Sequence, residues 1–151
     1  MKSVISRTAL ALALAGCAMT FGCTADVHDN TLNVENPKVD FDTTVDVDNI
    51  EQGQSVPITI KAENVYPVAP DQQPPPEHVK DAVFFKIFLD DEDSTPLIVT
   101  AQLSVSVQIP ADTEPGDHKL ICRMHSHDGA ATDVESEIDI KVKARVTTTG
   151  G

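Results

Sequence analysis

Apolar side chains recur at every second position from Val39 onward, and this alternation limits the possible fold more than any other feature of the sequence. A period of two predicts strands with one buried and one exposed face. The alternating sets are Val39, Phe41, Val45 and Val47; Val56, Ile58, Ile60 and Ala62; Leu103, Val105, Val107 and Ile109; His118, Leu120, Cys122 and Met124; and Ile138, Ile140 and Val142. Residues 83–89, apolar on nearly both faces, predict a central strand, and residues 97–99 predict a short edge strand. Together these segments give about seven short strands and no helix, which predicts an all-β antiparallel sandwich over residues 39–146.

Two connections between the predicted strands are distinctive. Residues 67–77 contain five prolines, which cannot join a sheet interior, so they predict a long, semi-extended loop. The loop is either an ordinary surface connection or a recognition loop held by a rigid scaffold. Residues 90–93 are four consecutive acids, whose carboxylates converge poorly for calcium, so a solvated turn is expected there. Residues 17–38 predict a flexible tether, and residues 147–151 predict a disordered tail.

Two segments, Ile50–Asn64 and Ile109–Cys122, resemble bacterial immunoglobulin-like domains at their second strand and at the turn into the sixth strand. The resemblance implies one immunoglobulin-like sandwich. The chain departs from antibody-type domains because Leu120 stands in place of the corner tyrosine and the second strand offers Cys122 no cysteine partner. No disulfide between the sheets is therefore expected, and the resemblance implies no particular function.

The N-terminal residues are typical of an export signal. Met1–Arg7 carries two basic side chains and no acid, and Thr8–Gly16 is apolar. That apolar run is about half the ~20 residues that would span a bilayer. It ends in Leu14-Ala15-Gly16-Cys17, which resembles the lipobox of bacterial lipoproteins. The resemblance implies removal of residues 1–16 and acylation of Cys17. Ala18, in place of an Asp, favours the outer membrane over the inner membrane of the cell envelope.

Other interpretations of the cysteines remain open. Cys23, preceded by Thr20-Phe21-Gly22, is an alternative acylation site, and an ordinary signal peptide cut near Ala25 would discard both cysteines. If Cys17 is acylated, Cys23 and Cys122 could pair in an oxidising compartment, although a buried free thiol at Cys122 is slightly favoured.

Charge restricts the partners. The chain has 11 basic and 24 acidic side chains, and residues 1–16 contribute two of the bases and none of the acids. The remaining chain carries 9 bases against 24 acids, a formal charge of −15. This excludes nucleic acid as an expected partner and leaves acyl chains, not electrostatic attraction, to hold the protein on a membrane.

Residues 122–128, Cys-Arg-Met-His-Ser-His-Asp, are the densest group of metal-ligating side chains. With His78 upstream, the Cys-x-x-His pattern resembles cupredoxins, which implies copper ligation by His78, Cys122 and His125. The axial methionine that usually follows is missing. A looser copper or zinc site of His118, His125 and His127 is a second possibility. The favoured interpretation has Cys122 and Met124 as core residues and both late histidines on an exposed loop.

No nucleophile elbow, zinc-protease helix or phosphate loop is present, so an enzyme is not expected. The sequence predicts a membrane-anchored lipoprotein whose non-catalytic immunoglobulin-like module has a binding or structural role. Protein or glycan would be recognised through the end loops or a strand edge. The alternatives are a periplasmic, cupredoxin-like copper protein and a spacer without a specific ligand.

Overall fold

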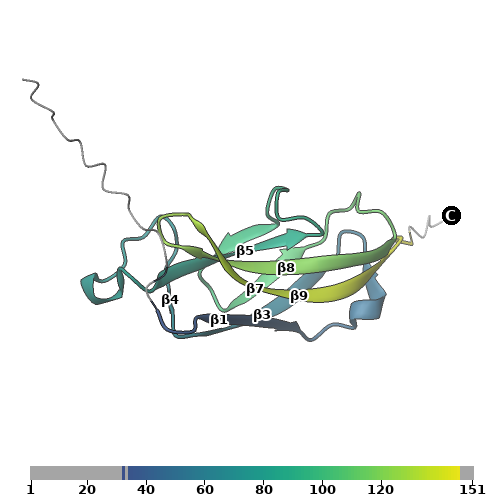
Figure 1. Cartoon of the computed structure of the whole chain (residues 1–151). Coiled ribbons are helices and arrows are strands. Elements are labelled where there is room, and N and C mark those ends of the chain that lie inside the picture. Colours follow the sequence, from purple (N-terminus) through teal and green to yellow (C-terminus); the bar gives the residue numbers. More distant parts are fainter. Residues whose placement is uncertain (1–31, 33, 147–151) are drawn as a thin grey trace, which may run out of the picture.

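A computed structural model describes residue 32 and residues 34–146 (Figure 1). The predicted signal peptide, Cys17, Cys23 and the predicted tail lie outside these residues. The described part of the chain forms strands, turns and two short 3₁₀ helices, which confirms the predicted all-β fold. The strands are β1 (Lys38–Thr43), β2 (Ile50–Glu51), β3 (Ser55–Glu63), β4 (Tyr66–Pro67), β5 (Ala82–Leu89), β6 (Ile98–Thr100), β7 (Ser104–Gln108), β8 (Gly116–Ser126) and β9 (Ala131–Lys143), and the 3₁₀ helices are η1 (Val47–Asn49) and η2 (Pro76–His78).

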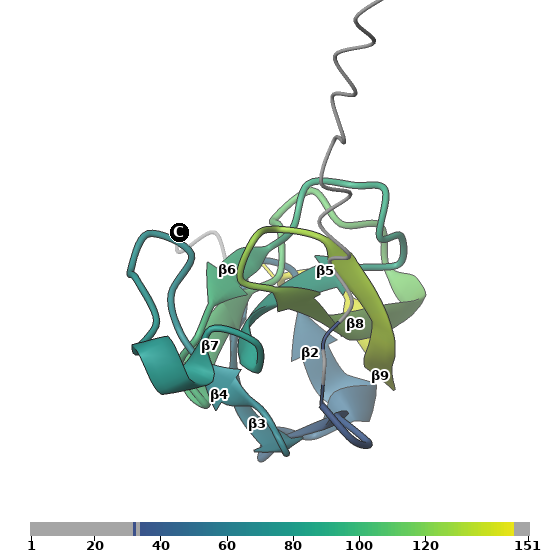
Figure 2. The same ribbon diagram turned by 60° about the vertical axis from the view of Figure 1, so that its left-hand side comes forward.

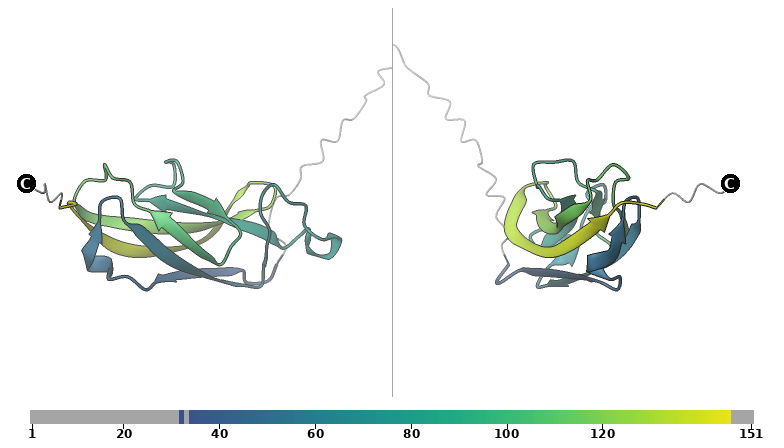
Figure 3. Two further views of the ribbon diagram at one scale, coloured as in Figure 1. Left: turned by 180° about the vertical axis from the view of Figure 1, so that it is seen from behind. Right: turned by 90° about the vertical axis from the view of Figure 1, so that its right-hand side faces the viewer.

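The strands form two sheets that face each other (Figures 1 and 3). One sheet has the order β1-β3-β7, and the other has the order β2-β9-β8-β5-β4, with β6 also paired to β5. All pairs are antiparallel except β2 with β9 and β4 with β5. Apart from the two-residue strands β2 and β4 there are seven strands. The first, second and fifth of these, β1, β3 and β7, form one sheet, which faces the third, sixth and seventh, β5, β8 and β9. This is the immunoglobulin-like arrangement, with the fourth strand, β6, paired to the third.

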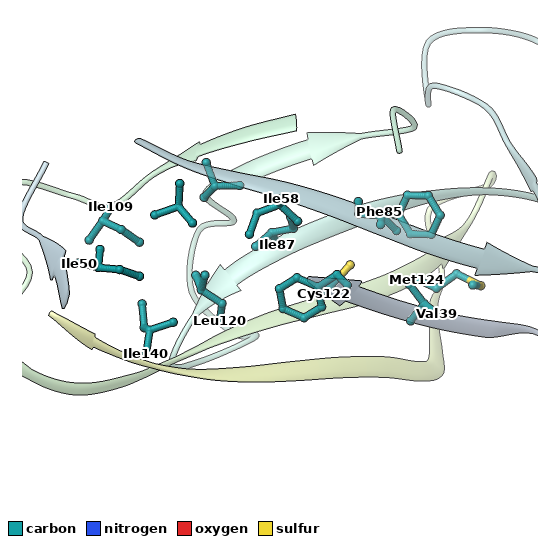
Figure 4. Packing of buried hydrophobic residues seen from close by; sticks show 14 of the residues in the cluster. Val39, Ile50, Ile58, Phe85, Ile87, Ile109, Leu120, Cys122, Met124 and Ile140 are labelled. Atoms are coloured by element: carbon teal, nitrogen blue, oxygen red, sulfur yellow. The ribbon is translucent and has the colours of Figure 1, made fainter. Parts of the chain in front are cut away.

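The core lies between the sheets, and most of its side chains are ones that the alternation predicts to point inward (Figure 4). Leu103, which the alternation also placed inward, lies just before β7 and is 44% exposed. Ile58 from one sheet and Phe85, Leu120 and Cys122 from the other are at most 1% exposed. β5 is buried on both faces, because Phe84 and Phe88 on its outer side are also buried. The predicted central strand is thus confirmed.

The first strand is shorter than predicted. β1 ends at Thr43, whereas the alternation favoured a strand that continued to Val47. Asp46 caps η1 instead, because its carboxylate accepts hydrogen bonds from the Asp48 N–H at 3.1 Å and from Asn49 Nδ2 at 2.9 Å. An aspartate side chain that bonds the following backbone competes with a strand. Val45 and Val47 still pack against the core from this turn.

Pro57 lies inside β3, where a proline normally breaks a sheet. Ile60 N–H donates to Leu103 O beside β7, so the odd-numbered residues of β3 direct their backbone groups toward β1. The position opposite Pro57 lies one residue beyond Thr43, where β1 ends. The missing N–H of Pro57 therefore costs the ladder no hydrogen bond. The Pro57 carbonyl accepts from Thr43 Oγ1 at 2.7 Å.

In the described part of the chain, no helix has the length and apolar character needed to cross a membrane.

Truncating Phe85 tests the packing of the two sheets. Phe85→Ala should lower the free energy of unfolding by about 3–5 kcal/mol, because it opens a cavity at a fully buried position. Urea denaturation measures this loss. Val79→Ala, at a side chain that is 59% exposed, is the control and should change stability by less than about 0.5 kcal/mol. Equal effects of the two substitutions would contradict the assigned core.

Candidate functional site

The connections before β5 and after β8 meet at one end of the sandwich, which we call the loop end (Figures 1 and 2). It contains residues 64–81, the turn of residues 127–130 and the start of β1, since Lys38 pairs with Glu63. The other end, the far end, contains the last residues of β9 and the turn that follows β5. β5 and β8 position the loop end, because Val83 pairs with Ser126 where the two strands meet it.

The proline-rich connection contacts the sandwich at several points along its length. Its first residues form β4, and Val68 N–H donates to Val83 O at 2.8 Å. Pro74 is buried. His127 holds the connection from the opposite side, because Nε2 contacts Gln72 O at 2.6 Å while the His127 N–H donates to Ala82 O at 3.0 Å. The loop that the prolines predict is confirmed, and these contacts attach it to β5 and to the turn that follows β8.

An aromatic pair lies on this connection. The rings of Tyr66 and His78 stack with centroids 4.0 Å apart and planes 6° apart. His78 Nδ1 lies 3.0 Å from the Asp81 carboxylate, and Tyr66 N–H donates to Asp81 O at 2.8 Å, so Asp81 contacts both members. Tyr66 is 37% exposed, and the neighbouring Val79 is 59% exposed. We call the partly exposed Tyr66 and His78, together with the adjacent Val79, the Tyr66 surface.

The structure does not bring the three residues of the cupredoxin pattern together. Cys122 lies in the core, where burial raises the pKa of its thiol to about 12. His125 points to the outer face of the same sheet and stacks on Phe84 at 5.4 Å. His78 belongs to the stack on Tyr66. Among the residues that the structure describes, no group of three or more His, Cys, Asp or Glu side chains is placed to hold a metal ion.

The expectation that His125 lies on an exposed loop is wrong. β8 continues to Ser126, and His125 is 6% exposed because it pairs with Phe84 and lies beneath the following turn. Its Nδ1 contacts Gly129 O at 3.3 Å, and its Nε2 is buried without a partner among the described residues. Burial is the main cause that lowers the pKa of His125. His127 does lie in the loop, as expected, but it is partly buried.

His118 lies near the far end, away from His125 and His127. Its Nδ1 contacts the Asp90 carboxylate and its Nε2 contacts Glu114 O, both at 2.7 Å. Because a carbonyl can only accept and a carboxylate prefers to accept, the doubly protonated ring satisfies both contacts. Burial would lower the pKa of His118, but the hydrogen bonds to Asp90 and Glu114 and the charges of Asp90 and Asp117 raise it overall.

Asp90 is a residue whose role the sequence analysis missed. It has a φ of 63°, and its carboxylate also accepts from the Lys119 N–H at 2.8 Å. The four-acid turn that contains it is confirmed as a turn. Tyr66 was missed as well, because no periodicity links it to His78. A single tyrosine in a chain with 4% aromatic residues was the one available signal.

Comparison with known proteins adds little to this description. No protein-family model matches the sequence, and no curated protein matches it. One solved structure, the extracellular domain of a protein described as a hybrid two component system from B. thetaiotaomicron, is similar with a TM-score of 0.45 and 12% identity. The similarity covers 80% of this chain and 17% of that chain, so this chain spans a small part of that structure's length. The assignment to the class of all-β sandwiches rests on the strand order and register described above.

The contacts of His118 predict a pH-dependent stability. A histidine whose pKa is raised in the fold stabilises it fully below its unfolded value of 6.5 and loses this contribution as pH rises through the folded pKa. The free energy of unfolding of the wild type should therefore exceed that of His118→Asn most at about pH 6 and least at about pH 9. Denaturant titrations across this range measure the difference.

Asp90→Asn is the matched variant, because asparagine also tolerates the positive φ at this position but carries no charge. Asp90→Asn should reduce the pH dependence of the free energy of unfolding, because it removes the charge that favours protonated His118. A difference between wild type and His118→Asn that stays constant across the range would contradict the assigned contacts.

Proposed function

We propose that this chain is a membrane-anchored extracytoplasmic lipoprotein whose immunoglobulin-like sandwich is a non-catalytic binding module. The module binds a protein partner through the Tyr66 surface. The observation that carries the proposal is an exposed aromatic ring held in one position by the stack on His78 and by the contacts of Asp81.

The proposal follows from the energetics of protein interfaces. A few tyrosine, tryptophan and arginine side chains contribute most of the binding energy in such interfaces. A binding loop that is already ordered avoids the entropy loss of ordering on association. The connection that carries Tyr66 meets both conditions, because Val68, Pro74 and Gln72 attach it to the sandwich and leave the ring partly exposed.

The anchor rests on the sequence between Leu14 and Cys17. The formal charge of −15 after Gly16 leaves electrostatic attraction to anionic lipid unfavourable, so the membrane contact comes from acyl chains. Leu32 packs against the core, so the free length runs from Cys17 to Leu32 and reaches at most about 55 Å when extended. It joins the sandwich at the loop end, so the Tyr66 surface and the anchor share one end of the domain.

Acylation is tested by substituting each candidate cysteine in the full chain. Cys17→Ala should abolish incorporation of radiolabelled palmitate and release the protein from the membrane fraction, because it removes the thiol that takes the lipid. Cys23→Ala is the matched control and should keep both the label and the membrane location. Loss of label in Cys23→Ala alone would assign the acylation site to Cys23. Absence of label from the wild type and from both variants would reject the lipid anchor.

Binding at the Tyr66 surface is tested by photo-crosslinking in cells that produce the protein. A photoreactive amino acid at position 79 should give an adduct with a single protein. The same probe at position 112, in the exposed corner at the far end, should give none. Tyr66→Ala should weaken the adduct to an extent that corresponds to about 2 kcal/mol or more, while the variant keeps the strand content of the wild type by circular dichroism.

Two outcomes would contradict a protein partner at this surface. Equal adducts at positions 79 and 112 would show that the probe reports contact without specificity. Binding of the wild type to a glycan array that is lost in Tyr66→Ala, with no protein adduct at position 79, would assign the surface to a glycan.

A further inference from the structure

The sandwich has two lateral sides with different edge strands. β1 and β9 lie next to each other on one side, where Ser136 Oγ donates to the Asp40 carboxylate at 3.3 Å. The order of the strands in the two sheets therefore places β6 and β7 on the opposite side, as Figure 2 shows. Each of these four strands has a length of backbone that is unpaired in the described part of the chain. Such an edge can accept a further strand unless it is protected.

The edge of β1 is protected by its own side chains. The even-numbered residues of β1 pair with β3, so the N–H groups of Phe41 and Thr43 point away from the sheet. Asp40 accepts the Phe41 N–H at 2.9 Å, and Asp42 accepts the Thr43 N–H at 2.7 Å. These carboxylates occupy the donors and bring negative charge to the edge. The edge of β9 is charged too, because its exposed positions include Asp133, Glu135, Glu137 and Asp139.

The edge of β7 has neither form of protection. In the ladder between β3 and β7, Leu103 lies opposite Ile60 and Ile109 lies opposite Gln54. Both are hydrogen-bonded positions. Since these positions alternate, the backbone groups of Ser104, Ser106 and Gln108 point away from the sheet. Within the described residues, no side chain hydrogen-bonds to the N–H groups of these three residues.

The edge is also uncharged. Residues 94–111 contain no Asp, Glu, Lys or Arg, although 23% of the chain is charged and its net charge is −13. Val99 and Leu103 belong to this uncharged run and are 43% and 44% exposed. This is the composition that natural edge strands avoid unless they are paired.

We propose that β7 is a self-association edge, at which two copies of the chain pair their β7 strands antiparallel about Ser106. The result is a continuous six-stranded sheet, β1-β3-β7 followed by the same three strands of the second copy in reverse order. The proposal is independent of the lipid anchor and of the Tyr66 surface, so its failure would leave both unaffected.

A second copy suits this edge for three reasons. Two acidic molecules can approach at an uncharged strand without the repulsion that their other edges would cause. Antiparallel pairing about Ser106 sets Ser104 opposite Gln108 and Val105 opposite Val107 of the other copy. The outward backbone groups of Ser104, Ser106 and Gln108 would then form about six hydrogen bonds between the copies, since each directly opposed pair exchanges two.

The outer face of β7 also continues smoothly across the pair. Ser55 Oγ and Ser106 Oγ are 2.7 Å apart, so a row of serine hydroxyls crosses from β3 to β7. In the pair, Ser106 would meet Ser106 of the other copy and extend this row across the two-fold axis. Hydrogen bonds between hydroxyl side chains on opposed strands stabilise sheets.

Light scattering of the full chain in detergent tests the proposal. The wild type should have the mass of a dimer, and Ser106→Lys should have the mass of a monomer, because it sets two ammonium groups opposite each other. Thr59→Lys is the control. It lies on the same outer face one strand inward, opposite Ser104, and should stay dimeric. A monomeric wild type, or a dimer that persists in Ser106→Lys, would overturn the proposal.

Two further variants guard against effects on folding. Ser106→Pro removes an outward N–H while sparing the ladder to β3, and it should also give monomers with the strand content of the wild type by circular dichroism. Ser106→Cys should form a disulfide-linked dimer under mild oxidation, whereas Ser55→Cys should not. A disulfide from position 106 to a different protein would assign the edge to that partner and reject self-association.

Discussion

The burial of β5 on both of its faces is the constraint on which the rest of the structure depends. Its inward side chains, among them Phe85 and Ile87, pack against the facing sheet, and Phe84 and Phe88 are buried on the other side. Both edges are also paired, with β8 on one side and with β4 and β6 on the other. A strand enclosed in this way fixes whatever adjoins it. The proline-rich connection is held by β4 at its start and leads directly into β5 at its end, so the Tyr66 surface is attached to a strand that is buried on both faces.

The sequence predicts the strands well because burial follows the alternation of side chains, and it fails where a contact overrides that alternation. β3, β5 and β8 lie where Ile58, Phe85 and Leu120 indicate. The strand predicted through Val47 ends early because the Asp46 carboxylate caps a turn, which parity cannot show. The sequence placed His125 on an exposed loop, because it could not show that β8 continues through this residue or that Phe84 and the following turn cover it. Contacts such as Tyr66 with His78, or Asp90 with His118, join residues in separate segments and leave no periodic signal.

β8 carries two histidines whose pKa values move in opposite directions, and their surroundings explain the difference. His118 has an acceptor at each ring nitrogen, so the charged form is favoured. His125 is stacked on Phe84 with one nitrogen unpartnered, so burial favours the neutral form. Cys122 lies between them in the core, and a thiol with a pKa of about 12 stays protonated and unreactive at neutral pH. The metal-ligating side chains of β8 therefore lie on two faces of the strand and at two ends of the sandwich.

The placement of Lys38 and Lys143 at opposite ends of the sandwich has a mechanical consequence. Tension between Lys38 and the last residues of β9 acts along the strands. The hydrogen bonds between antiparallel strands run perpendicular to that direction, so they are loaded together in shear and do not open one at a time. Resistance to such a force is governed by the rate of unfolding and not by the equilibrium stability. If Cys17 is acylated as proposed, the domain transmits a pull from its far end to the membrane while the sheets stay intact.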